Sequence, residues 1–367
     1  MNIKLHKIKE IFSFNNTSPQ SKSIIHGQYP HIVQDKIYWQ SRLNNSFVSV
    51  EYATIENDSV VMSKEGTVLT KSLACQNFRV FYDDNPATPF DEKWKAIGGY
   101  HVGRSSIKIT NPTKEQIINS PLHQELTGCK VSESASIRTL QDVVWKSETK
   151  LLFTDDDPHP RHANGLYVFK SKDGIKWKNY HPAPVLSAFT PCKDEVSFNF
   201  DTMPSIFYDH NNSEYVLYSR SNIKLGVRHV LCSTSKDLIT WSVPKLIKKN
   251  PEFLFSCENL YYMGAYRLPG TKKYIAFPAH FKNDILNADG SQRRYYDAKT
   301  LVMISDDKYN WDVKAEIFLD FSNGHLTQPH VVSFRKEEEK YIIYVHEGFM
   351  TGQSKLVKYS IELGEIK

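Results

Sequence analysis

Three stretches of the chain repeat one short pattern: SKDGIKW at 171–177, SKDLITW at 235–241 and SDDKYNW at 305–311. Each reads S-x-D-x-x-x-W, and the tryptophans lie 64 and then 70 residues apart. Self-similarity at a fixed spacing indicates a fold built from copies of one unit. In each copy we expect the Ser and Asp side chains to bind backbone amides of a turn. The Trp is expected to cover the seam between neighbouring units.

The three S-x-D-x-x-x-W stretches are called boxes below. Short runs rich in Val, Ile, Tyr and Phe precede each box, such as SIFYD and EYVLYS before the second and TLVMISD before the third. Such runs, bounded by Asn, Asp, Gly and Pro, are typical of strands and hairpins. Two further segments have the strand pattern of a unit but no recognisable box: HIVQDKIYWQS and HVVSFRKEEEKYIIYVHEG. The sequence therefore predicts an all-β chain that folds as a five-bladed β-propeller of four-stranded antiparallel blades.

The expected organisation is a single domain over residues 1–367 with an insertion in the second blade. The blades are expected at approximately 22–74, 75–182, 196–250, 256–320 and 324–367. The insertion, at about 104–165, would carry a short helix within 113–126. The N-terminal run KLHKIKEIF is expected to complete the last blade. Another all-β fold and a multidomain arrangement are the alternatives.

Charge and cysteine content narrow the function classes. The chain has 46 basic and 41 acidic residues, a net charge of +5, and no basic block, which argues against nucleic acid as a partner. The five cysteines show no zinc spacing, so we expect reduced thiols. The sequence has neither the apolar core of a signal peptide nor a run long enough to span a membrane. We expect a soluble cytoplasmic protein, with leaderless export as the alternative.

Three acidic residues lie at the expected entrances of inner strands: Asp83 in FRVFYDDNP, Asp201 in FNFDTMP and Glu258 in FSCENLYYMGAY. The first two share the pattern D-x-x-P. Carboxylates that converge from consecutive blades suit cleavage of a glycosidic bond, which needs an acid and a base or nucleophile. We assign Glu258 as the acid, Asp83 as the base or nucleophile, and Asp201 as the stabiliser of positive charge.

A purely structural role competes with this assignment, because Asp is a common turn residue and D-x-x-P could be capping geometry. The neighbouring Asp84 is the alternative functional member, since strand alternation would send Asp83 to the other face. Further candidates for binding substrate are arginines, histidines, aromatic residues and a glutamate. They are Arg79, Arg220, Arg228, His31, His280, His330, Trp39, Tyr262 and Glu347. For each of these a packing or solvent-facing role is at least as well founded.

No cofactor is expected. The run TDDDPHPRH at 154–162 has the oxygen ligands that calcium prefers, but it lacks the spaced ligand pattern of a calcium loop. A solvated loop is therefore the preferred interpretation, and no metal site is assigned. The chain also has no P-loop, GxGxxG, GxSxG or HExxH motif, which removes the commonest nucleotide, serine hydrolase and zinc protease readings.

The boxes, the FYDDNP and FNFDTMP segments and the run SEYVLYSRSN to RHVLCSTSKDLITWS resemble the invertase-like and arabinanase-like five-bladed glycoside hydrolases. The resemblance spans about residues 75–350, and is closest to uncharacterised glycosyl-hydrolase-like proteins allied to those families. It implies that Asp83, Asp201 and Glu258 act as nucleophile or base, transition-state stabiliser and acid. Sialidase boxes read S-x-D-x-G-x-x-W, one residue longer than those here.

The leading hypothesis is hydrolysis of a glycosidic bond in an oligosaccharide, polysaccharide or glycoconjugate. The main alternative is a propeller that binds carbohydrate without catalysis, in polysaccharide or glycoconjugate assembly. A protein-interaction scaffold would instead present a large apolar patch on one face.

Overall fold

The computed structural model describes thirteen stretches of the chain: 3–14, 24–43, 46–70, 77–99, 165–181, 185–187, 197–199, 202–222, 228–251, 258–282, 296–317, 329–348 and 354–364. Within them the regular structure is β-strand apart from short 3₁₀ turns, and no helix is long and apolar enough to cross a bilayer. The helix predicted within 113–126 and the loop at 154–162 lie outside the described residues. The insertion predicted at about 104–165 lies almost wholly outside them and stays a prediction.

The described strands form five sheets. The first holds β2 (Ile24–Val33), β3 (Lys36–Leu43), β4 (Ser46–Glu56) and β5 (Ser59–Thr70). The second holds β6 (Arg79–Tyr82), β7 (Trp94–Gly99), β8 (Gly165–Ser171), β9 (Trp177–Asn179) and β10 (Leu186–Ser187), with the 3₁₀ turn η3 (Phe90–Glu92) between β6 and β7.

The third sheet holds β11 (Ser197–Asn199), β12 (Ser205–Asp209), β13 (Glu214–Asn222), β14 (Arg228–Ser235) and β15 (Lys245–Leu246). The fourth holds β16 (Lys248–Asn250), β17 (Glu258–Tyr261), β18 (Ala265–Arg267), β19 (Tyr274–Ala276), β20 (Ala279–Lys282), β21 (Tyr296–Ser305) and β22 (Asn310–Ile317). The fifth holds β23 (His330–Glu337), β24 (Lys340–Glu347), β25 (Lys355–Leu363) and β1 (Ile3–Ser13).

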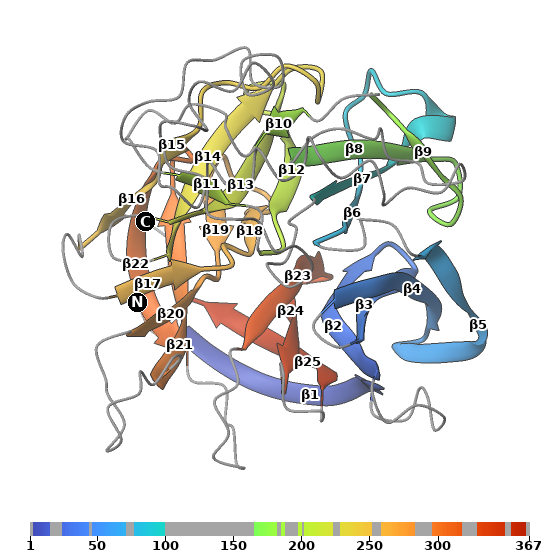
Figure 1. Cartoon of the computed structure of the whole chain (residues 1–367). Helices are drawn as coiled ribbons and strands as arrows, with labels where there is room; N and C mark the ends of the chain where they lie inside the picture. Colours follow the sequence, from blue (N-terminus) through green and yellow to red (C-terminus); the bar gives the residue numbers. More distant parts are fainter. Residues whose placement is uncertain are drawn as a thin grey trace, which may run out of the picture.

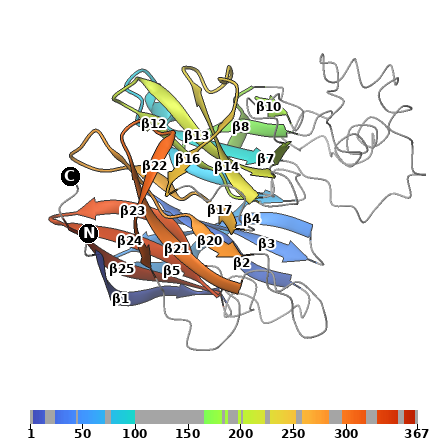
Figure 2. The same cartoon turned by 90° about the vertical axis from the view of Figure 1, so that its left-hand side faces the viewer.

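The innermost strands of the sheets, β2, β6, β12, β18 and β23, stand around a common centre (Figure 1). Each contacts the next: β2 lies against β6 and β23, and β12 lies against β6 and β18. The hydroxyl of Tyr266 in β18 closes the circle by donating to the carbonyl of Val331 in β23 (3.4 Å). The side view in Figure 2 shows the strands of the same sheets lying side by side. The chain is thus an all-β propeller, as the sequence predicts.

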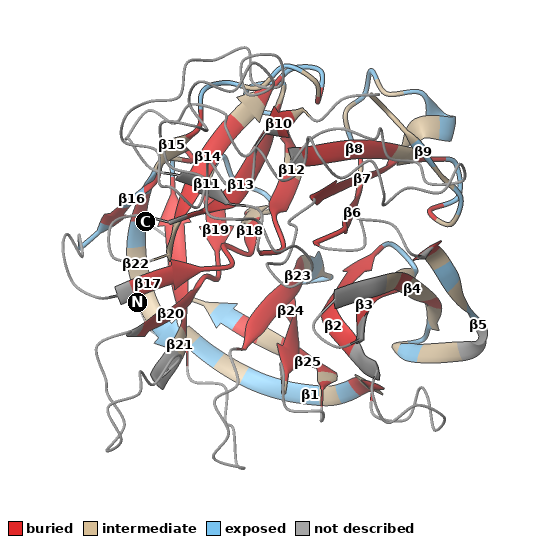
Figure 3. Cartoon of the chain, in the orientation of Figure 1, coloured by how far each residue is buried: buried red, intermediate tan, exposed pale blue. Residues whose placement is uncertain are grey.

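The N-terminal strand joins the ends of the chain. β1 pairs antiparallel with β25 from Ile3 opposite Leu363 to Ser13 opposite Lys355, and is the outermost strand of the order β1-β25-β24-β23. Its outer position leaves β1 exposed or half-buried over nearly its whole length, whereas the strands at the centre are buried (Figure 3). The closing strand predicted from KLHKIKEIF is therefore confirmed.

The three S-x-D-x-x-x-W boxes form the same turn. In the second box, Ser235 Oγ accepts from the amide of Asp237 (3.2 Å), and Asp237 Oδ1 accepts from the amides of Ile239 and Thr240 (2.8 and 2.7 Å). The first and third boxes repeat these bonds. Burial alone would raise the pKa of each box Asp, but the turn amides lower it. The predicted turn role of the boxes is confirmed.

Tyrosines tie the boxes to the preceding sheet. Tyr38 in β3 donates to the carbonyl of Gly174 (3.0 Å), and Tyr218 in β13 donates to the carbonyl of Lys308 (3.0 Å). The box residue Trp311 packs edge-on against Tyr218, with ring centroids 5.9 Å apart, and is 1% exposed. A box tryptophan therefore covers a seam between sheets, as expected.

Replacing Tyr218 by Phe is expected to lower the free energy of unfolding by about 1 kcal/mol, because the buried carbonyl of Lys308 loses its donor. Thermal unfolding followed by circular dichroism measures the change. The matched control is Tyr82→Phe, since the half-buried Tyr82 makes no hydroxyl hydrogen bond within the described stretches. Equal midpoints for the two variants would contradict this role of the hydroxyl.

A charge network joins the first and fifth sheets. Lys358 Nζ lies 2.6 Å from Asp58 Oδ2 and 2.8 Å from Glu337 Oε2, and Arg335 binds Glu337 as well. These side chains line a hollow of about 460 Å³ together with Tyr344 and Gln34. Burial would raise the pKa of Asp58 and of Glu337, but the hydrogen bonds and positive charges of Lys358 and Arg335 lower both.

This network should make stability depend on pH. Because both folded pKa values are depressed, its contribution is present above the unfolded pKa values of about 4 and is lost as pH falls through the folded ones. Lys358→Met should therefore lower the melting temperature at pH 7 and have a smaller effect near pH 3. Melting curves of both proteins over this range give the comparison. A difference in melting temperature between the two proteins that stays constant or widens in acid would contradict the network's contribution to stability.

Candidate functional site

The propeller has two ends with different residues. The end where the innermost strands of the sheets begin is called the mouth face; there Val80 donates its amide to His31 Nε2 (3.0 Å) and Ala265 to Ser205 Oγ (3.3 Å). The end where these strands finish is called the turn face. It gathers the turn after β6, the turn after β12 and the boxes, as the bond from Lys308 to Asp209 shows (3.2 Å).

Asp83 lies on the turn face, directly after β6, and is fully buried. Its carboxylate accepts from the amide of Asn85 (3.1 Å), from the Thr88 hydroxyl (2.7 Å) and from the hydroxyl of Tyr215 in the third sheet (2.9 Å). These bonds shape the β6–β7 turn and tie the second sheet to the third. Asp83 therefore has the structural role that competed with catalysis, and its position does not support a role as base at the mouth.

The structural counterpart of Asp83 is Asp209. Asp209 is the last residue of β12, is fully buried, and accepts from the amide of Asn211 (3.1 Å) and from the hydroxyl of Tyr274 in the next sheet (2.7 Å). Burial would raise the pKa of Asp209, but hydrogen bonds from Asn212, Tyr274 and Lys308 lower it. The signal was visible in the sequence as FYDDN at 81–85 and FYDHN at 207–211. The shared D-x-x-P pattern instead aligns Asp83 with Asp201, which is not its structural equivalent.

Asp84, the alternative to Asp83, is also on the turn face. It is exposed, and its carboxylate lies 2.7 Å from His210 Nε2 of the following turn. Asp84 is thus a surface link between two turns and is not placed with the mouth residues.

The other two predicted acids belong to segments at the mouth. Glu258 is the first residue of β17, where its backbone pairs with Lys282 of β20; its side chain lies outside the described part. Asp201 itself lies outside the described residues, directly before Thr202. The expected meeting of these two carboxylates therefore stays a prediction.

Side chains fill the centre of the propeller at the mouth. Arg79 crosses from β6 and donates to the carbonyl of Val332 in the fifth sheet (3.2 Å). The rings of Tyr262 and His330 lie 4.8 Å apart, and Tyr29 stacks on His330 at 6.2 Å. Burial lowers the pKa of His330 to about 3 and raises the pKa of Tyr262, an effect that Arg79 partly offsets. His330 is therefore neutral and in the core.

His31 and Trp39 are also core residues. His31 is fully buried: Nδ1 lies 3.2 Å from the carbonyl of Tyr29 and Nε2 accepts from Val80, so both ring nitrogens are used within the protein. Burial, with the charge of Arg79, lowers the pKa of His31 well below its usual value. Trp39 donates to Glu51 (2.6 Å) and packs on Phe14. Neither offers the surface for a sugar that the sequence suggests.

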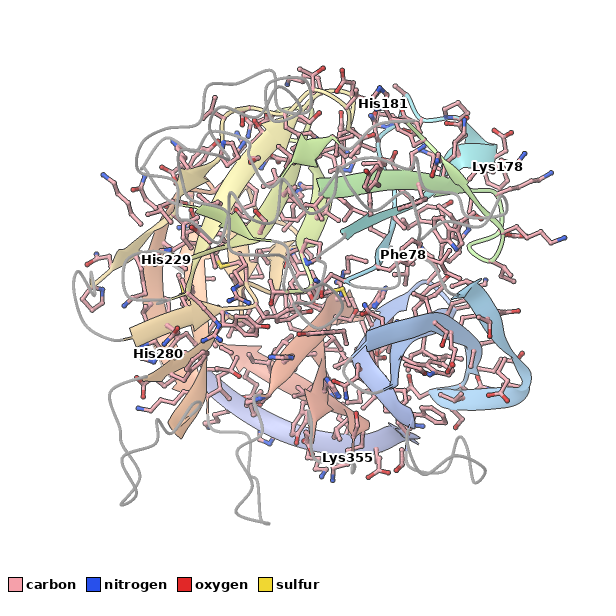
Figure 4. The ribbon with its side chains drawn as sticks, viewed as in Figure 1. Phe78, Lys178, His181, His229, His280 and Lys355 are labelled. Carbon is pink, nitrogen blue, oxygen red and sulfur yellow. The ribbon has the colours of Figure 1, made fainter. Side chains whose placement is uncertain are left out.

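His280 and Glu347 lie away from the centre. His280 is buried in β20, opposite Leu260 of β17, and Figure 4 shows it beside the fourth sheet. Glu347 ends β24, buried, where it accepts from the Tyr359 hydroxyl and lies 3.4 Å from Lys355 Nζ. Glu347 thus joins β24 to β25.

A small pocket, too narrow for a water molecule, lies between the third and fourth sheets at the mouth. Its polar and aromatic lining comes from β13, β14, β17 and the segments before β12 and β18: Thr202, Ser219, Arg220, His229, Tyr261 and Tyr262. Arg220 and Tyr262 were predicted from the sequence. The other four were missed, although each of them is a direct neighbour of a predicted residue in the sequence.

Two arginines face one aromatic ring beside this pocket. The guanidinium carbons of Arg220 and Arg228 each lie 5.7 Å from the ring centroid of Tyr261, and Arg228 also lies 5.8 Å from Phe281. The backbone amide of Arg228 donates to Asn259 Oδ1 (2.9 Å), which fastens β14 to β17. Of the predicted binding residues, the structure thus brings Arg220, Arg228 and Tyr262 together. His229 lies in the same region (Figure 4).

Within the described stretches no group of three His, Cys, Asp or Glu side chains could hold a metal ion. Cys232 is the one cysteine there; it is free and buried, and burial raises the pKa of its thiol to about 12. A reactive thiolate at this position is therefore not expected at neutral pH.

Comparisons with known proteins agree with the fold. No protein-family model and no curated protein matches the sequence. Among solved structures, one described as a glycoside hydrolase matches at 11% identity with a TM-score of 0.54, covering 98% of this chain and 92% of its own. An endo-arabinase from Bacteroides thetaiotaomicron VPI-5482 matches at 11% identity with a TM-score of 0.52, covering 97% of this chain and 98% of its own.

An N-acetylgalactosamine deacetylase from F. plautii, in complex with blood group B trisaccharide, matches at 9% identity with a TM-score of 0.53, over 98% of this chain and 95% of its own. Identities this low carry the fold and not the activity. The chain is an all-β propeller with the fold of glycoside hydrolases.

Proposed function

We propose that the protein is a carbohydrate-active enzyme of the glycoside hydrolase type, with each of its five sheets forming one blade and its site at the mouth face. The observation that carries the proposal is the pocket between the third and fourth sheets, lined by hydroxyl, guanidinium, imidazole and aromatic groups. Such groups bind sugar hydroxyls and stack on sugar faces. The fold shared with a glycoside hydrolase and an endo-arabinase supports the same function.

The catalytic pair in this proposal is Glu258 and Asp201. Glu258 stands three residues before the pocket residue Tyr261 in β17, and Asp201 directly precedes the pocket residue Thr202. Glu258 acts as the acid that protonates the leaving oxygen, and Asp201 acts as nucleophile or base in place of Asp83. Two carboxylates are sufficient for either stereochemical outcome. Their mutual repulsion would keep one protonated near neutral pH.

Reducing-end release from a panel of oligosaccharides and polysaccharides by the purified protein tests the proposal. Turnover of at least one glycan is expected. Binding of a glycan without any release of new reducing ends would instead support the non-catalytic alternative, because arginine and hydroxyl groups hold a sugar whether or not it reacts.

The reaction is expected to need no metal, since two carboxylates and water supply all its proton transfers. Dialysis against EDTA should therefore leave the rate of glycan cleavage unchanged. The same preparation dialysed without chelator is the control. Loss of activity in EDTA that calcium restores would contradict this part of the proposal.

A further inference from the structure

Two buried hydroxyl groups in the mouth pocket have no hydrogen-bond partner within the described part of the chain: Thr202 Oγ1 and Ser219 Oγ. Each residue is 5% exposed. Buried polar atoms are almost always paired, and an unpaired one costs about 1–3 kcal/mol. Two such atoms in one narrow pocket are available to a polar group of a ligand once the side chains around them move apart.

Among the described residues, the charged groups around these hydroxyls are positive. Arg220 and Arg228 lie in neighbouring strands, with Arg220 opposite Val230 and Arg228 opposite Asn222, and both face Tyr261. His229, the residue after Arg228, lines the pocket, and none of the described residues that line it is acidic. Arg220 and Arg228 take part in further interactions, so the inference depends on their number and position.

We propose, on the basis of the function proposed above, that the saccharide bound at the mouth is anionic and that Arg220 and Arg228 recognise its carboxylate or sulfate group. The planar guanidinium fork matches such oxyanions with paired hydrogen bonds. The hydroxyls of Thr202 and Ser219 complete the contacts to the sugar.

Calorimetric titration with oligogalacturonate and oligoglucuronate tests the proposal, with the carboxyl-reduced form of each oligosaccharide as its neutral match. A sulfated galactan oligosaccharide and its desulfated form distinguish sulfate from carboxylate. At least one anionic form should bind about tenfold or more tightly than its neutral match, and the difference should shrink as salt is added.

Arg228→Gln, at a half-exposed position, should remove most of this preference, and Arg228→Lys should restore part of it. Arg220→Gln serves as the second variant once circular dichroism shows native melting. The matched control is Arg267→Gln, at the turn-face end of β18. Equal binding of charged and neutral forms would overturn the inference and leave the proposed function standing. Absence of binding to every saccharide would count against both.

Discussion

Replacing Glu258 by Gln is expected to reduce glycan cleavage by roughly 10²–10⁴-fold, the usual contribution of a general acid or base. The amide keeps the shape of the side chain but has no proton to give to the leaving oxygen. Folding should be preserved, because the backbone pairing of Glu258 with Lys282 is unchanged in the amide variant. Steady-state rates on the cleaved glycan, with the melting temperature of each protein, measure both effects.

The matched control is Asp83→Asn. That variant should lose about 1–3 kcal/mol of stability, because three donors, including Tyr215, meet the carboxylate in a buried turn. Its rate should stay near that of the parent at a temperature where both are folded. An inactive, fully folded Asp83→Asn protein beside an active Glu258→Gln protein would reverse the assignment made here.

Deleting residues 1–14 is expected to abolish cooperative thermal unfolding. β1 pairs along its whole length with β25, so its loss exposes a long strand edge. The deletion also removes Ile11 and Phe14, which are 8% and 2% exposed in the core with Trp39. Burying side chains of this kind stabilises by about 1.5–3 kcal/mol each. Circular dichroism melting, and gel filtration for association through the free edge, give the measurement.

A synthetic peptide of residues 1–14 added in trans should restore a folding transition. Lys4→Ala is the control within the strand, because Lys4 is exposed and its change should leave the melting temperature nearly unaltered. A truncated chain that melts at the temperature of the full chain would show that the propeller closes without β1.

The repeated turn is the part of the fold that sequence determines most locally. Ser235, Asp237 and Trp241 act within seven residues, so their spacing alone predicts the turn and its position in a unit. Closure by β1 was also predictable, because KLHKIKEIF is strand-like and the last unit lacks a fourth strand. The blade insertion falls on residues outside the described stretches and cannot be compared.

The site was less predictable because residues in similar sequence motifs lie at opposite ends of their strands. Asp83 and Asp201 share D-x-x-P, yet Asp83 follows its strand while Asp201 precedes β12. A four-residue strand carries the chain about 13 Å, from one face of the propeller to the other. His31 shows the second difficulty. Its burial comes from Val80, 49 residues away, and no local pattern reveals that contact.

A crystal structure of the Glu258→Gln protein with a bound oligosaccharide tests the central claim most directly. The sugar should lie at the mouth face, within hydrogen-bond distance of Arg220 and against Tyr261. A sugar bound at the turn face, in the hollow lined by Asp58 and Lys358 or beside Asp84, would contradict it.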